Sequence, residues 1–388
     1  MQQVRIGIAG IGNMGSAHAQ NIFAGRIPGG VLKAVCDINP ERLEWARNCF
    51  GNDLLTFDDA EKMFASGIID AAIIATPHYM HPPLAIQAFK SSLHVLVEKP
   101  AGVYTKQVRE MNEVAEKTDK VFCMMFNQRI NPVYQKVKDL VQSGELGELR
   151  RVNWIITDWF RTQAYYDSGS WRATWSGEGG GVLVNQCPHQ LDLLQWICGL
   201  PKRVMSFCQY GKHHNIEVED EVTAYFEYEN GATGVFITST GEYPGTNRLE
   251  ITGDRGKIIV EDNKISFHRT RDSVENILEN CPESFPKPEV WYCDVPVYGQ
   301  NTAHNGILTN WVQAILNGTP LIAPGTEGIR GVELANAIHL SSWVGDWVEI
   351  PVDEELFLQK LNERISSSRG QKKVIKNKVS DVSGSFGA

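Results

Sequence analysis

The sequence predicts an α/β protein in which a Rossmann domain, built on a doubly wound parallel sheet, precedes an α+β domain with a large, mostly antiparallel open sheet. Two observations predict this: short apolar strands alternate with amphipathic helices at first, and β-rich segments separated by turn residues dominate after Gly147. The length of 388 residues exceeds one ordinary core. We assign residues 1–128 to the Rossmann domain, 129–365 to an α+β substrate and oligomerisation domain, and 366–388 to a polar tail that is either disordered or an arm ordered by a partner.

Strands and helices alternate along the first domain. The apolar run Ile69–Ala75 is typical of a strand that helices cover on both faces. The other expected strands are Val4–Ala9, Val31–Cys36, His94–Val97 and Val121–Phe126, and the expected helices are Asn13–Phe23, Glu41–Phe50, Pro82–Lys90 and Thr105–Lys117.

The second domain shows the pattern of an antiparallel meander. Turn signals such as Glu229-Asn230-Gly231 separate its β-rich segments. One helix is expected at about Leu183–Cys198, and two more at His304–Leu316 and Gly328–Val344. The expected strands are Leu149–Trp159, Val204–Tyr210, Glu221–Tyr228, Thr233–Thr240, Arg248–Gly253, Lys257–Val260 and Lys264–Arg269.

Composition narrows the class of protein. A net charge of −9 argues against nucleic acid and anionic membranes as partners. The eight cysteines form no C-x-x-C pair, so we expect neither a zinc site nor a redox motif, and no bound metal. We find no signal-peptide pattern at the N-terminus and no apolar run of membrane-spanning length, which favours a reducing cytoplasm.

A dinucleotide site is predicted where the first strand meets the first helix. Gly10-Ile11-Gly12-Asn13-Met14-Gly15 matches G-x-G-x-x-G in that context. Gly10 permits the tight turn, Gly12 lets the backbone approach a pyrophosphate, and Gly15 allows the helix to pack closely on the strand. Asp37 ends the second strand, where a carboxylate holds the ribose hydroxyls of NAD and repels a 2′-phosphate. No arginine follows it directly, so the expected cofactor is NAD rather than NADP.

Further motifs follow the later strands, at the edge of the sheet where α/β proteins bind ligands. They are Thr76-Pro77 with His81, the triplet Glu98-Lys99-Pro100, and Gly179-Gly180-Gly181 leading to His189. In this order, and with the glycine turn, the chain resembles the family of glucose–fructose oxidoreductase and myo-inositol 2-dehydrogenase over roughly residues 4–200. The resemblance implies that Thr76, Pro77, His81 and Glu98 lie at the cofactor, as do Asn13 and Met14 of the glycine turn.

The resemblance also implies the catalytic pair. Lys99 is expected to contact the reacting hydroxyl, with Pro100 starting a cis-like or kinked turn, and His189 to act as the base. These residue types suit the chemistry, because an ammonium stabilises developing negative charge on oxygen and an imidazole titrates near neutrality. Family members often carry an aspartate where this chain has Asn185, and an amide cannot serve as a base or counter-ion. Asp192, three residues after His189, either orients the imidazole or is an ordinary polar helix residue.

The segment before the glycine run is rich in aromatic residues, which pack against the C–H faces of sugars. Tyr165 and Arg172 are the preferred substrate contacts, together with Asn185, Lys99 and His189. Trp171 and Trp175 are expected to add an apolar wall, although aromatics here equally suit a core or an oligomer contact. Asn127 and Arg129 follow another strand and are expected to line the crevice; His304 is a weaker candidate.

The asparagine variant resembles the branch of the family that contains levoglucosan dehydrogenase and glycoside 3-dehydrogenases. We therefore expect hydride transfer between a secondary ring hydroxyl, with C3 the first choice, of a sugar or glycoside and NAD, in a homo-oligomer (dimer, tetramer or hexamer). Three alternatives stay open: an inositol dehydrogenase, an NAD-dependent glycosidase acting by transient 3-oxidation, and a non-catalytic NAD-binding regulator. The Gly-Gly-His-Gly-Gly run of the glycosidase branch is absent, since Val182 follows Gly181.

Overall fold

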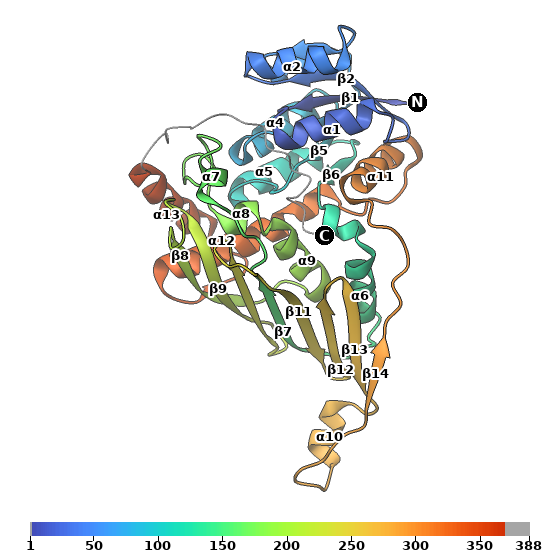
Figure 1. The fold of residues 1–388 in the computed structure, drawn as a ribbon, viewed down its shortest axis with the longest axis vertical. Coiled ribbons are helices and arrows are strands. Elements are labelled where there is room, and N and C mark those ends of the chain that lie inside the picture. Colours follow the sequence, from blue (N-terminus) through green and yellow to red (C-terminus); the bar gives the residue numbers. More distant parts are fainter. Residues whose placement is uncertain (1, 369–388) are drawn as a thin grey trace.

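The computed structural model describes residues 2–368 and contains two sheets stacked end to end (Figure 1). The first is a parallel sheet of six strands in the order β3-β2-β1-β4-β5-β6. Its strands are β1 (Val4–Ala9), β2 (Gly30–Cys36), β3 (Leu55–Phe57), β4 (Ala71–Ile74), β5 (His94–Val97) and β6 (Phe122–Met124). The strand order reverses between β1 and β4, and a ligand crevice is expected beside the carboxyl ends of the strands at such a point.

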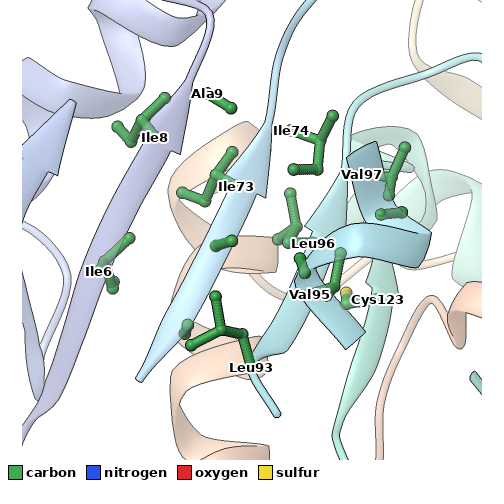
Figure 2. Close-up of a cluster of buried hydrophobic side chains, with 14 of the residues drawn as sticks. Ile6, Ile8, Ala9, Ile73, Ile74, Leu93, Val95, Leu96, Val97 and Cys123 are labelled. Atoms are coloured by element: carbon green, nitrogen blue, oxygen red, sulfur yellow. The ribbon is translucent and has the colours of Figure 1, made fainter. Parts of the chain in front are cut away.

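Helices cover the parallel sheet, which explains its apolar strands. All four residues of β4 are buried, and Figure 2 shows Ile73 and Ile74 packed between β1 and β5. The helices are α1 (Asn13–Phe23), α2 (Pro40–Phe50), α3 (Ala60–Phe64), α4 (His81–Lys90), α5 (Thr105–Ala115) and, from late in the chain, α11 (Ala303–Asn317). Trp311 and Val312 of α11 are buried in the same core, so this helix packs on the Rossmann sheet.

The second sheet has nine strands in the order β14-β13-β12-β11-β7-β10-β9-β8-β15. All neighbours are antiparallel except β7 and β10, which run parallel. The fold class predicted from the sequence is therefore confirmed. The strands are β7 (Leu149–Ile156), β8 (Arg203–Tyr210), β9 (Glu219–Glu227), β10 (Thr233–Ser239), β11 (Asn247–Gly253), β12 (Gly256–Glu261), β13 (Lys264–Thr270), β14 (Val290–Asp294) and β15 (Val348–Glu349).

One face of this sheet packs on helices. Val222, Ala224 and Phe226 of β9 point into the core, whereas Thr223 and Tyr225 between them are exposed. This alternation is that of a sheet covered on one side. The remaining helices are α6 (Pro132–Gln142), α7 (Gln163–Tyr166), α8 (Val182–Asn185), α9 (Pro188–Cys198), α10 (Val274–Asn280), α12 (Gly328–Val344) and α13 (Glu354–Ser367), with 3-10 turns η1 (His78–Met80), η2 (Asn127–Ile130) and η3 (Gly325–Glu327).

The helix expected over Leu183–Cys198 is interrupted, which corrects that prediction. It consists of α8 and α9, and Pro188 is the first residue of α9. Proline has no N–H to continue a preceding helix and disfavours helical geometry just before it. The break separates Asn185, at the end of α8, from His189, in the first turn of α9. Most of the predicted tail, residues 369–388, lies outside the described residues.

Candidate active site

The glycine turn between β1 and α1 has the geometry of a phosphate-binding loop. Gly10 has φ +86°, and a Cβ there would lie 2.6 Å from the carbonyl oxygen of Ala75. A Cβ on Gly15 would lie 1.8 Å from the carbonyl oxygen of Gly10. Gly12, by contrast, has open space around its Cα and caps α1 without a side chain. The N–H groups of the first turn, which begins with Asn13 and Met14, are thus open to an anion.

Asp37 lies directly after β2, as expected, and its carboxylate faces the glycine turn. Its Oδ2 accepts from the N–H of Ile11 at 2.9 Å, and its Oδ1 accepts from the N–H of Asn39 at 2.9 Å. Arg42, which the sequence analysis passed over, donates to the carbonyl oxygen of Ile11 and to Ser16 and stacks on Trp45.

The loops after β4 and β5 are tied together by His81. Its two ring nitrogens lie 2.7 Å from the carbonyl oxygens of Pro100 and Thr76, so the imidazole joins the two segments that carry the predicted motifs. The Lys99–Pro100 bond is cis, one of the two forms, cis-like or kinked, that were expected for this turn. The hydroxyl of Thr76 is buried without a hydrogen-bond partner among the described residues, while Pro77 beside it is exposed.

Glu98 is a buried carboxylate held by a buried histidine. Its Oε1 lies 2.6 Å from Nε2 of His18 on α1, and its Oε2 accepts from the N–H of Lys99 at 3.1 Å. Burial alone would raise the pKa of Glu98, but His18, His304 and Lys99 lower it to about 2. His304, at the start of α11, reaches the same region, with its ring 5.8 Å from that of His18 and its Nδ1 3.4 Å from Nδ2 of Asn127.

Lys99 joins the two domains at the site. Its Nζ donates to the backbone carbonyl oxygen of Asn185 at 2.7 Å. Burial lowers the pKa of Lys99, whereas the carboxylates of Glu98 and Glu178 raise it. The ammonium is thus a desolvated donor with two donor positions left for a ligand.

His189 is buried, and neither ring nitrogen has a hydrogen-bond partner among the described residues. Burial, followed by the charges of Lys99 and His304, puts the pKa of His189 well below 6.5. A neutral imidazole is therefore present at pH 7, with one nitrogen free to accept a proton.

A chain of polar contacts continues from Lys99 toward the predicted substrate residues. The Nδ2 of Asn185 donates to Glu178, and a guanidinium nitrogen of Arg172 lies 3.9 Å from the same carboxylate oxygen. Arg172 also donates to the hydroxyl of Tyr165 at 2.9 Å and lies over the rings of Tyr165 and Trp171. The structure therefore brings together Lys99, Asn185, Arg172 and Tyr165 from four separate segments.

These features fit a bound NAD. The open space at Gly12, the uncapped first turn of α1 and the unpartnered hydroxyl of Thr76 lie along one edge of the parallel sheet. Thr76 is close to the glycine turn, since a Cβ on Gly10 would lie 3.0 Å from its Cγ2. Gly12, Asn13 and Met14 would receive the pyrophosphate and Asp37 the ribose.

Among residues 2–368, no three His, Cys, Asp or Glu side chains are placed to hold a metal ion, and no helix there has the length and apolarity to cross a membrane.

Comparison with known families agrees with this geometry. Residues 4–126 match the model of the oxidoreductase family with an NAD-binding Rossmann fold, and residues 134–259 match the GFO/IDH/MocA C-terminal domain. The chain belongs to the GFO/IDH/MocA family. It is an NAD-dependent oxidoreductase, as the sequence predicted.

Relatives and solved structures of this family cover most of the chain. Levoglucosan dehydrogenase of Pseudarthrobacter phenanthrenivorans is 26% identical, over 90% of this chain and 99% of that protein. The scyllo-inositol 2-dehydrogenase (NAD(+)) of Bacillus subtilis is 27% identical, over 66% and 74%. The WlbA dehydrogenase of Bordetella pertussis, solved with NADH and UDP-GlcNAcA, superposes with a TM-score of 0.75 at 26% identity, over 90% of this chain and all of that one.

In this GFO/IDH/MocA protein Arg129 does not line the crevice, and Asp192 is bonded to it rather than to His189. Arg129 is fully buried and pairs with Asp192, through contacts of 2.7 and 2.6 Å, and with Glu327. Because both oxygens of Asp192 are used by Arg129, with Gln195 adding a bond, Asp192 does not orient His189. A buried arginine needs such carboxylates, so this pair holds α9 to η2.

Trp175 also lies away from the predicted sugar wall. Its ring packs against Tyr210, His339 and Trp343, in the core of the second domain. Trp171 does reach the site, edge-on to His78. Besides Arg42, sequence reasoning missed Glu178 and His18 at this site. The one local signal for Glu178 was its place directly before Gly179, the first glycine of the run.

Proposed function

We propose that this GFO/IDH/MocA enzyme oxidises a secondary ring hydroxyl, with C3 the first choice, of a sugar or glycoside, using NAD. His189 carries the proposal: a buried imidazole whose two nitrogens have no partner among the described residues, close enough to Lys99 to be influenced by its charge. A buried polar side chain without a partner is costly, which supports a ligand at this point.

The proposed chemistry needs a proton acceptor and a donor to oxygen. The neutral His189 accepts the hydroxyl proton at one ring nitrogen as the C–H bond breaks. Lys99 donates a hydrogen bond to the same oxygen and stabilises its growing negative charge until the carbonyl forms. NAD, when bound, supplies the hydride acceptor. The domain contact between Lys99 and Asn185 keeps the donor aimed at one point.

A sugar fits the remaining groups. Arg172 and Gln186 donate to the hydroxyl of Tyr165 at 2.9 and 3.2 Å, which leaves the proton of that hydroxyl for an oxygen of the substrate. The named substrates of relatives, levoglucosan and inositol, are polyhydroxylated rings as well. An inositol is the second candidate, because inositol dehydrogenases are among the relatives. A screen of sugars, glycosides and inositols that follows NADH, with the product's oxidised carbon found by NMR, decides between them.

NAD is expected to be preferred over NADP. The carboxylate of Asp37 faces the glycine turn, and placing a 2′-phosphate against it costs several kcal/mol, equivalent to a preference in kcat/KM of roughly 10²-fold or more. The measurement is kcat/KM with each cofactor. Equal values would mean that Arg42, which lies beside the same turn, neutralises the phosphate and that the assignment of Asp37 is wrong.

The protein is expected to form a homo-oligomer through the open face of the nine-stranded sheet. Phe207 on β8 is 63% exposed there, Tyr225 on the neighbouring β9 is 37% exposed, and Ile155 on β7 of the same sheet is 36% exposed. Phe207→Glu would place a charge in that interface, so we expect a smaller mass by light scattering than for the wild type. Phe285→Glu is the control, because Phe285 is also an exposed phenylalanine, at 92%, but lies beyond α10, outside the sheet. A wild type that is monomeric at micromolar concentration would contradict the proposal.

A further inference from the structure

Glu178 is a buried carboxylate that is hydrogen-bonded to Asn185, the residue whose backbone carbonyl accepts from Lys99. One oxygen accepts from the N–H of Ala173 and the other from Nδ2 of Asn185. Its own backbone oxygen lies 3.1 Å from Nδ1 of His78, which fixes the segment that carries it.

We propose, on the basis of the function proposed above, that Glu178 is a positioning residue that gives Asn185 the hydrogen-bonding polarity of a carboxylate toward the substrate and supplies the negative charge that a carboxamide at position 185 lacks.

The polarity follows from the chemistry of the pair. Burial raises the pKa of Glu178, whereas Arg172, the N–H of Ala173, the amide of Asn185 and Lys99 lower it. In its ionised form this carboxylate can only accept hydrogen bonds, so the amide of Asn185 turns its NH₂ group toward Glu178. Its Oδ1 then points away from Glu178, and no described residue donates to it. Because Asn185 is half-buried beside Lys99, this oxygen is available to accept from a substrate hydroxyl. Asn185 therefore presents an acceptor rather than a donor.

The charge acts on Lys99. Removing a negative charge near an ammonium disfavours its protonated form, so the loss of Glu178 lowers the pKa of Lys99. If the reaction needs the ammonium, activity is then lost at a lower pH on the alkaline side. Several titratable or charged groups interact electrostatically with Lys99: Glu98, Glu178, Arg161, Arg172, His78, His81, Cys187, His189 and His304.

The carboxylate of Glu178 and the amide of Asn185 can exchange positions through the variants Glu178→Gln and Asn185→Asp, which together form a double-mutant cycle. In Glu178→Gln, the single remaining oxygen can serve Asn185 or Ala173 but not both. In Asn185→Asp, two carboxylates meet and repel each other. In the double variant, the new amide at position 178 accepts from Ala173 through its oxygen and donates through its NH₂ to the new carboxylate at position 185. Both bonds thus return with one negative charge, and a carboxylate again lies next to Lys99.

We expect each single variant to lose about 10²-fold in kcat/KM, as for a misplaced catalytic geometry, and the double variant to recover to within about 10-fold of the wild type. The alkaline limb of the pH profile should move to lower pH in Glu178→Gln and return in the double variant. Thermal unfolding should show the same pattern of loss and recovery. Glu219→Gln is the control: this buried carboxylate accepts from Gly181 and Leu183, so its loss should lower the Tm without moving the alkaline limb.

The proposal is overturned if Glu178→Gln keeps the kcat/KM and pH profile of the wild type, or if the double variant loses as much as the product of the two single losses. It is also overturned if recovery appears in the Tm but not in kcat/KM, since the pair would then be structural only. If Glu178→Gln does not fold, Asn185→Asp is the deciding variant. A wild-type kcat/KM in that variant would show that a carboxylate at position 185 is not repelled by Glu178, and would overturn the proposal. A wild type that oxidises no sugar or inositol marks the failure of the proposed function instead.

Discussion

Replacing His189 with alanine is expected to lower kcat by about 10²–10⁴-fold, because a general base contributes that much to proton transfer. Binding of NAD should change little, since His189 lies on the second domain, away from the glycine turn. The fold should also tolerate the change: the imidazole makes no hydrogen bond to the described residues, so its removal leaves no partner behind.

Replacing Lys99 with methionine should lower kcat by about 10²–10³-fold, as for the loss of other donors to a developing oxyanion.

The same site predicts the acid side of the pH profile. Burial and the nearby positive charges lower the pKa of His189, which means that the neutral form persists below the usual histidine range. Activity needs the neutral imidazole and falls only when the pH drops through that lowered pKa. The acid limb of kcat/KM should therefore lie below pH 6.5, and His189→Ala should abolish it.

A matched control is His94→Ala. His94 is the first residue of β5, and its Nδ1 accepts from the N–H of Val121. It therefore lies at the amino ends of the parallel strands, whereas the site lies at their carboxyl ends. Its replacement should leave kcat within a few fold of the wild type. A His189→Ala enzyme with wild-type kcat across the pH range would exclude His189 from the mechanism.

Features that depend on residues close together in the sequence were predicted correctly. The glycine turn, the end of β2 at Asp37 and the apolar run of β4 each depend on neighbours within a few residues, and each lies where it was expected. Lys99, Asn185 and Arg172 were found because their motifs sit at strand ends or beside glycines, where side chains reach a crevice. The contact between Lys99 and Asn185 was not derivable, since it joins segments 86 residues apart.

Long-range pairing explains what was missed or wrong. Arg129 was placed in the crevice because it follows β6. In the structure it is buried and paired with the carboxylates of Asp192 and Glu327, which lie 63 and 198 residues away in the sequence. Trp175 was placed on the sugar wall because it is aromatic, yet α12 supplies the rings that enclose it. Glu178 drew no notice, because an acidic residue beside glycines usually marks a solvated turn. Only the fold shows that this carboxylate is buried beside Asn185.

A 3-deoxy sugar is expected to be the poorest analogue of the physiological substrate. If C3 carries the reacting hydroxyl, its removal takes away both the proton for His189 and the oxygen that Lys99 contacts. It also leaves those two buried groups unpaired, and sites built to bind a hydroxyl reject analogues lacking it by roughly 10⁴-fold or more. The 2-deoxy and 4-deoxy analogues lose only a flanking contact, such as one to Asn185 or Arg172, and should be oxidised with a kcat/KM reduced by about 10–10²-fold. The measurement compares kcat/KM for the parent sugar and its three deoxy analogues, with the product identified by NMR. If the 3-deoxy compound is oxidised as well as the parent, Lys99 and His189 act on another carbon of the ring. The analogue that shows the steepest loss then identifies that carbon.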